Sequence, residues 1–164
     1  MDLVGSAKLG RNTMVTPEEL CEIEEIKEVR YLYTHYYDGQ RVEELADLFT
    51  EDAVCEFGEE YGGNWVGREQ IYNNYKNFIE GEGDDPHGVM HAVVNPWIRL
   101  ADETTAHGRW YLLDLRTSEG VENPLILFGI YDETYKKTDD GWKIQRTRID
   151  FLWPRREYQP SSNL

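Results

Sequence analysis

Apolar positions recur at helical spacing in the first third of the chain. Thr16 and Glu19 form the pattern of a capping box, and Pro17 takes the first helical position. The apolar positions that follow are Ile23, Ile26, Val29, Leu32, Tyr33, Tyr36 and Tyr37. They predict a helix that begins after Thr16 and ends at Asp38-Gly39. A short second helix is predicted next. Its apolar face consists of Val42, Leu45, Leu48 and Phe49.

The rest of the pattern predicts strands and turns, with one further helix. Residues 53–57 form a short apolar run, and the Gly-rich stretch 58–63 predicts turns. Residues 67–80 predict a third helix. Its inward positions are Ile71, Tyr75, Phe78 and Ile79. After the polar loop 81–88, alternation predicts four strands. They cover residues 89–100, 104–116, 124–137 and 142–153. Pro96 predicts a bulge or an edge position in the first of these strands.

This order of elements predicts the fold class. Helices come first and an antiparallel meander follows, which is typical of an α+β domain with helices packed on one face of a curved sheet. No internal repeat or low-complexity linker marks a boundary between domains. We therefore expect a flexible N-terminus over residues 1–15, a single domain over 16–154 and a C-terminal tail over 155–164.

Charge and composition narrow the class of function. The 164 residues include 32 acidic and 17 basic side chains, and the formal charge of −15 repels nucleic-acid phosphates and anionic membranes. No apolar run is long enough to span a membrane or to form a signal peptide. We expect a cytoplasmic protein in which Cys21 and Cys55 are reduced thiols. Aromatic residues make up 13% of the chain, which favours both a bulky core and an apolar pocket that carries hydroxyl groups.

Asp38 and His91 are the first candidates for chemistry. Asp38 ends the first helix, where the helix dipole disfavours a carboxylate unless a cation lies beside it. The alternative is the ordinary Asp of an Asp-Gly turn. His91 lies in the apolar run VMHAVV and is either a core histidine or a general base. A protonated His91 would supply the cation that Asp38 lacks.

Two further residues also allow two interpretations. Tyr33 is either a core aromatic or a hydroxyl that donates to a substrate oxygen, since a phenol stays protonated in an apolar pocket. Asp114 ends an aromatic stretch and needs a partner if it is buried. It either forms a structural ion pair with Arg109 or Arg148, or it acts in the site.

Motifs for metals and cofactors are weak. His87 and His91 are four residues apart, a spacing that suits a metal site on a helix. Pro86 and Gly88 place His87 in a loop instead. The sequence has no nucleotide-binding loop, nucleophilic Ser or Cys motif, or Rossmann glycine pattern. We expect neither a metal nor a cofactor.

Six segments together resemble the SnoaL-like, or NTF2-like, superfamily, and they cover most of the chain from Glu18 to Trp153. They are IKEVRYLYTHYYDG, ELADLFTEDAV, GREQI, VMHAVV, AHGRWYLLD and YDETYKKTDDGWKI. Within this superfamily the chain is most similar to lyases of the bile acid 7α-dehydratase and scytalone dehydratase type. The resemblance implies a cone-shaped α+β barrel, a small apolar organic substrate, and a homodimer or homotrimer.

The resemblance also implies site residues. In those lyases a Tyr and an Asp near the end of the first helix act with a His on a central strand, and these positions match Tyr33, Asp38 and His91. Asp114 falls on a functional position as well. The bile acid enzyme has a Tyr and an Arg where this chain has Phe57 and Phe151. We expect the substrate-binding residues to be Asp114, Phe57, Trp110, Phe151 and Tyr61.

These interpretations predict a cofactor-independent lyase that acts on a small hydroxylated compound, sterol-like or aromatic. His91 would remove an acidified C–H proton, Asp38 would orient His91, and Tyr33 would polarise a carbonyl or assist the leaving group. One alternative is an isomerase with the same proton chemistry. The other is a non-catalytic binding or assembly subunit, like the small subunit of a ring-hydroxylating dioxygenase. A large distance between Asp38 and His91 would favour that subunit.

Overall fold

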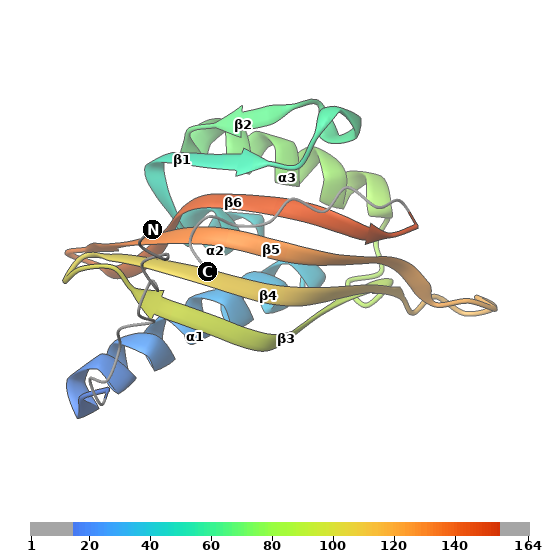
Figure 1. Cartoon of the computed structure of the whole chain (residues 1–164). Coiled ribbons are helices and arrows are strands. Elements are labelled where there is room, and N and C mark those ends of the chain that lie inside the picture. The colour runs from blue at the N-terminus through green and yellow to red at the C-terminus, as the bar shows by residue number, and fades with distance from the viewer. Residues whose placement is uncertain (1–14, 155–164) are drawn as a thin grey trace, which may run out of the picture.

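The computed structural model describes residues 15–154 (Figure 1). In this part of the chain the helices are α1 (Pro17–Asp38), α2 (Val42–Asp47), α3 (Arg68–Glu82) and the short 3₁₀ helix η1 (Glu59–Tyr61). The strands are β1 (Phe49–Glu56), β2 (Asn64–Val66), β3 (Val89–Leu100), β4 (Thr105–Arg116), β5 (Leu125–Thr138) and β6 (Gly141–Trp153). The expectations for residues 1–14 and for the C-terminal tail lie outside the described residues.

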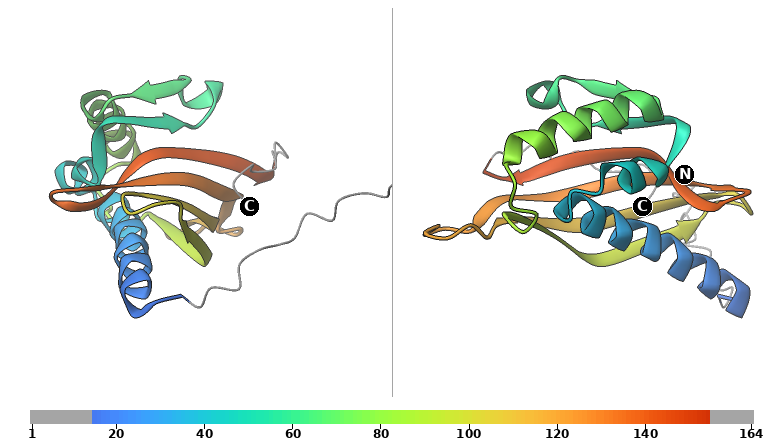
Figure 2. Two further views of the ribbon diagram at one scale, coloured as in Figure 1. Left: turned by 60° about the vertical axis from the view of Figure 1, so that its left-hand side comes forward. Right: turned by 180° about the vertical axis from the view of Figure 1, so that it is seen from behind.

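The sheet is one curved layer with the helices on one face (Figure 2). Its strand order is β2-β1-β6-β5-β4-β3, and the predicted antiparallel meander from β3 to β6 is confirmed. The bulge predicted at Pro96 is confirmed by a register shift between Val94 and Trp97. The predicted α+β fold, with N-terminal helices packed on a curved sheet, is therefore the observed one. None of the helices within residues 15–154 has the length and apolarity needed to cross a membrane.

The predicted start and end of α1 are confirmed. The Thr16 hydroxyl accepts from the Glu19 backbone N–H, and the Glu19 carboxylate accepts from the Thr16 N–H. At the other end, the Gly39 N–H donates to the carbonyl of His35. The reciprocal cap stabilises the helix start by about 1 kcal/mol, and the helix end places Asp38 against the sheet.

Two boundaries differ from the prediction. Strand β1 begins at Phe49 rather than at residue 53, because Phe49 pairs with Ile144 of β6 in a parallel arrangement. Phe49 therefore belongs to β1 and not to the apolar face of the second helix, which ends at Asp47. Strand β2 has only three residues, too few for its alternation to be recognised, and its central Trp65 is buried. These strands extend the sheet over α3 and close one side of the core.

Candidate active site

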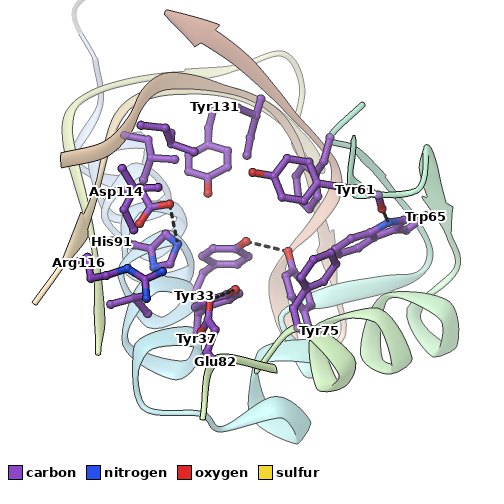
Figure 3. Close-up of a pocket in the computed structure, with 17 residues that line it drawn as sticks. Tyr33, Tyr37, Tyr61, Trp65, Tyr75, Glu82, His91, Asp114, Arg116 and Tyr131 are labelled. Carbon is purple, nitrogen blue, oxygen red and sulfur yellow. Dashed lines mark hydrogen bonds and ion pairs between the residues drawn. The ribbon is translucent and has the colours of Figure 1, made fainter. Parts of the chain in front are cut away.

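A cavity of about 210 Å³ lies between the inner face of the sheet and helices α1 and α3 (Figure 3). Eight of its seventeen wall residues are Tyr, Phe or Trp, and they include the tyrosines Tyr33, Tyr37, Tyr61, Tyr75 and Tyr131. Its charged and titratable members are Glu82, His91, Asp114 and Arg116. An apolar wall with a few converging polar groups is the usual form of a small-molecule site.

Asp38 and His91 are in direct contact. The Asp38 Oδ1 atom lies 2.6 Å from His91 Nδ1, and the His91 backbone N–H donates to Asp38 Oδ2 at 3.0 Å. Since the carboxylate only accepts, Nδ1 carries the proton and Nε2 is the basic nitrogen of the neutral ring. The last turn of α1 thus fixes both the orientation and the tautomer of an imidazole on β3.

Asp114 and Tyr37 also lie beside the His91 ring. His91 and Asp114 are directly paired across β3 and β4, and Nε2 lies 3.9 Å from Asp114 Oδ2. The Tyr37 ring packs edge-on against the imidazole, with 4.5 Å between ring centroids. The Tyr37 hydroxyl donates to Glu82 Oε1 at 3.1 Å, at the end of α3. The imidazole therefore has neighbours on two further elements of the cavity wall, and its Nε2 lies on the side of Asp114.

Tyr33 reaches the same cavity from α1, one and a half turns before Asp38. Its hydroxyl lies 2.7 Å from the Tyr75 hydroxyl of α3, and both rings are buried. Burial raises the pKa of Tyr33 and of Tyr75 well above that of a free phenol. Both hydroxyls therefore stay protonated at neutral pH and remain hydrogen-bond donors.

The structure combines a curved sheet covered by helices on one face, a cavity rich in aromatic residues, and a histidine oriented by a carboxylate. The model of the SnoaL-like domain matches residues 18–148. The chain belongs to the SnoaL-like domain family.

Solved structures agree with this family. A provisionally named scytalone dehydratase from Novosphingobium aromaticivorans is 26% identical with a TM-score of 0.70, over 87% of this chain and 91% of that one. An NTF2-like protein with a cystatin-like fold from the same organism is 19% identical with a TM-score of 0.68, over 87% and 94% of the two chains. LinA is 18% identical with a TM-score of 0.70, over 90% and 100%. The last two likenesses concern the fold alone.

Burial raises the pKa of both carboxyls that line the cavity of this SnoaL-like domain. Burial raises the pKa of Asp114, and the nearby Asp38 carboxylate adds to the rise, while His91 and Arg116 oppose it. Burial also raises the pKa of Glu82, although the hydrogen bond from Tyr37 opposes that rise. Perturbed carboxyls beside a histidine are common in catalytic sites.

The expected ion pairs of Asp114 are not formed. Arg109 extends from the opposite face of the sheet, because residue 109 differs from residue 114 by an odd number along β4. Arg148 shares the face of Arg109, because both are directly paired with Asp132 of β5. Arg109 lies 3.4 Å from Asp132, and Arg148 lies 3.0 Å from Asp150. Asp114 instead lies beside His91, which favours a role in the site.

Most of the site residues predicted from the sequence line the cavity of this SnoaL-like domain. Those in the wall are Tyr33, Phe57, Tyr61, His91 and Asp114, and Asp38 lies directly behind His91. Trp110 and Phe151 are not part of the wall, in contrast to the prediction.

The positions of these two rings explain the difference. Trp110 lies four residues before Asp114 on β4, where it donates to the Tyr135 hydroxyl at 3.1 Å and packs against Tyr31 of α1. Phe151 stacks on Tyr61 with 6.2 Å between ring centroids, and Tyr61 forms the wall there. Both rings are buried in the core but are not among the residues that line the cavity.

Several wall residues were not singled out from the sequence. Tyr37 and Tyr75 were assigned to apolar helix faces, and their burial is consistent with that, yet both also carry hydroxyls into the site. Glu82 and Arg116 end α3 and β4, and no local motif marks either of them. Within residues 15–154, no three His, Cys, Asp or Glu side chains come close enough together to hold a metal ion.

Proposed function

We propose that this SnoaL-like domain is a cofactor-independent lyase that eliminates water, or another small group, from a carbonyl compound with a hydroxyl at the β position. The observation that carries the proposal is the 2.6 Å contact between Asp38 and His91 Nδ1, which leaves Nε2 on the side of Asp114, another residue of the cavity wall. An imidazole whose Nδ1–H is held by a carboxylate can act as a general base through its other nitrogen.

The proposed reaction begins with proton transfer from carbon to His91 Nε2. The imidazolium that forms donates Nδ1–H to Asp38, and Asp114 lies 3.9 Å from its other nitrogen. The electron pair of the broken C–H bond moves toward the carbonyl oxygen, where the Tyr33 hydroxyl donates a hydrogen bond. The electron pair then forms the C=C bond, the hydroxyl group leaves, and the proton on Nε2 joins it to give water.

The cavity limits the size of the substrate. An apolar cavity of about 150 Å³ accommodates benzene, so a volume of about 210 Å³ suits a compound of one or two rings better than a full sterol. The aromatic walls favour a planar molecule through stacking and edge contacts. Similarity to the provisionally named scytalone dehydratase is in line with loss of water from such a compound.

A mass-spectrometric screen tests the proposal. Wild-type protein is incubated with β-hydroxy ketones of one and two rings, with hydroxylated sterols and with lignin-type aromatics. We expect a one- or two-ring substrate to lose the mass of water. His91→Gln should abolish the loss, while His87→Gln, an exposed histidine four residues earlier, should retain it.

Other outcomes would replace the proposal. A product of unchanged mass but changed chromatographic retention would identify an isomerase. Tight binding without any conversion, equal in wild type and His91→Gln, would identify a binding module.

A further inference from the structure

A buried ionic network extends from the sheet to the cavity wall. The Arg30 Nη1 atom of α1 lies 3.0 Å from Glu133 Oε1 of β5, and both side chains are 0% exposed. The other Glu133 oxygen accepts a hydrogen bond from the Tyr135 hydroxyl. That hydroxyl in turn accepts from Trp110 Nε1 at 3.1 Å. Every group on the carboxylate side of the pair is thereby hydrogen-bonded.

The other side of Arg30 contacts only aromatic faces. Its Cζ atom lies 3.4 Å from the ring centroid of Tyr131 and 3.9 Å from that of Tyr33. Its Nε and Nη2 atoms make no hydrogen bond to any residue between 15 and 154. Guanidinium groups stack on aromatic faces in this way. Both rings line the cavity, and Figure 3 shows their hydroxyls directed into it.

Packing alone does not account for this pair. Apolar side chains of similar volume usually stabilise a core as well as a buried ion pair does, because burial removes both charges from water. The Arg30–Glu133 pair also has a direction. Glu133 lies on the side of Tyr135 and Trp110, away from the cavity, and Arg30 lies between Glu133 and the two tyrosine rings. The positive end of the pair therefore faces the cavity.

We propose that Arg30 is a positioning residue that makes the Tyr33–Tyr131 end of the cavity a site for a substrate oxygen that becomes negatively charged. The ligand class is an enolisable ketone or a phenol, whose oxygen accepts from the two tyrosine hydroxyls. The inference rests on the proposed function, because the enolate arises when His91 removes the carbon proton. The base and the oxygen site thus belong to different walls of one cavity.

The other charged groups around the cavity do not supply this cation. Asp114 and Glu82 also line the cavity, but they are carboxyl groups and ionise only to a negative charge. Arg116 is exposed at the end of β4, so water screens its charge. The Cys55 thiol lies near Tyr33, and burial raises its pKa so that it stays neutral. Arg30 is the positive charge that the protein shields from water next to the tyrosines.

A titration of bound 2-naphthol tests the proposal without turnover. The naphtholate is followed by absorbance at wavelengths where tyrosine does not absorb, and the pH of half-ionisation is compared between variants. Arg30→Met removes the cation, so bound naphthol should ionise at a pH higher by about one unit or more than in wild type. Glu133→Gln keeps the shape and one of the two acceptor oxygens but removes the counter-charge, so the ionisation should shift to lower pH.

The opposite signs distinguish this role from a structural one. Both substitutions break a buried pair and should lower the free energy of unfolding, so a purely structural role predicts shifts of the same sign or none. Either of those results would overturn the proposal, as would the absence of naphthol binding to wild type. If Arg30→Met does not fold, Arg30→Lys should keep the wild-type ionisation, and a shift as large as that expected for Arg30→Met would overturn the proposal.

The test is also separate from that of the lyase. Opposite shifts without turnover of any compound would support the oxygen site and reject the elimination. Turnover that depends on His91 without opposite shifts would do the reverse.

Discussion

Replacing Asp38 separates its contribution to stability from its contribution to catalysis. Its carboxylate accepts from the His91 backbone N–H at 3.0 Å and from His91 Nδ1 at 2.6 Å. The side chains of Asp38 and His91 are only 20% and 11% exposed. Asp38→Ala leaves both donors without an acceptor, and each loss costs about 1–3 kcal/mol. We expect the free energy of unfolding to fall by about 2–4 kcal/mol.

Asp38→Asn should affect stability much less than activity. The amide keeps one acceptor oxygen and nearly the same volume, so the loss of stability should be about 1 kcal/mol. The amide has no charge to stabilise the imidazolium, and it does not enforce the tautomer with the proton on Nδ1. In Ser-His-Asp hydrolases the same substitution lowers kcat by about 10⁴. We expect turnover to fall at least about 100-fold in both Asp38 variants.

Urea unfolding followed by tryptophan fluorescence measures the first quantity, and initial rates on the best compound from the screen measure the second. Asp47→Asn is the matched control, because its carboxylate pairs with Arg68 at the surface and is 75% exposed. That control should keep both the stability and the rate. A wild-type rate in Asp38→Asn, or wild-type stability in Asp38→Ala, would refute the reasoning.

Three further predictions test the packing and the buried groups. A Cβ on Gly108 would lie 2.8 Å from a tyrosine ring carbon, so Gly108→Ala should lower the free energy of unfolding by about 1–3 kcal/mol. A Cβ on Gly81 meets no atom within 4 Å, so Gly81→Ala should not lower it. Equal urea midpoints for the two variants would contradict this prediction. Burial raises the pKa of Asp114, so ionisation of this carboxyl lowers the stability of the folded protein as the pH rises through that pKa. Asp114→Asn should therefore be more stable than wild type at pH 8, by on the order of 1 kcal/mol. In thermal melts this advantage should shrink toward pH 4. An advantage that does not depend on pH would rule out the carboxyl as its source. Cys21 is exposed, whereas Cys55 is buried and its pKa is raised by that burial. A thiol reagent should therefore modify one cysteine in the folded protein and both in urea. Rapid modification of two thiols without urea would contradict the packing around Cys55.

Local sequence signals predicted the elements whose boundaries are set locally. The capping box at Thr16 and the helical spacing after it determine α1, and alternation between tight turns determines β3 to β6. The start of β1 was missed because its partner, Ile144, is distant in sequence and pairs with Phe49 in parallel. The start of β1 is set by this tertiary pairing, about which the β-propensity of the local residues carries little information.

The site shows the same division. Asp38 and His91 are 53 residues apart, and the local sequence around each is equally compatible with a turn aspartate and a core histidine. The family resemblance predicted from the sequence that the two side chains act together. In the sequence, Arg30 is one of several charged residues on a helix, and nothing nearby indicates that it is buried. Its burial is explained by its partner Glu133, which follows 103 residues later. Trp110 and Phe151 lie in the core outside the cavity wall, since a buried aromatic residue need not reach a cavity.

The most direct test of the central claim is deuterium uptake from D₂O into 2-tetralone, a two-ring ketone without a leaving group. If His91 removes a carbon proton, wild-type protein should exchange the α-hydrogens faster than buffer, as mass spectrometry would show. His91→Gln should return the rate to that of buffer. Exchange that is equally fast in His91→Gln, or wild-type protein that binds the ketone without exchange, would contradict the assignment of His91 as the base.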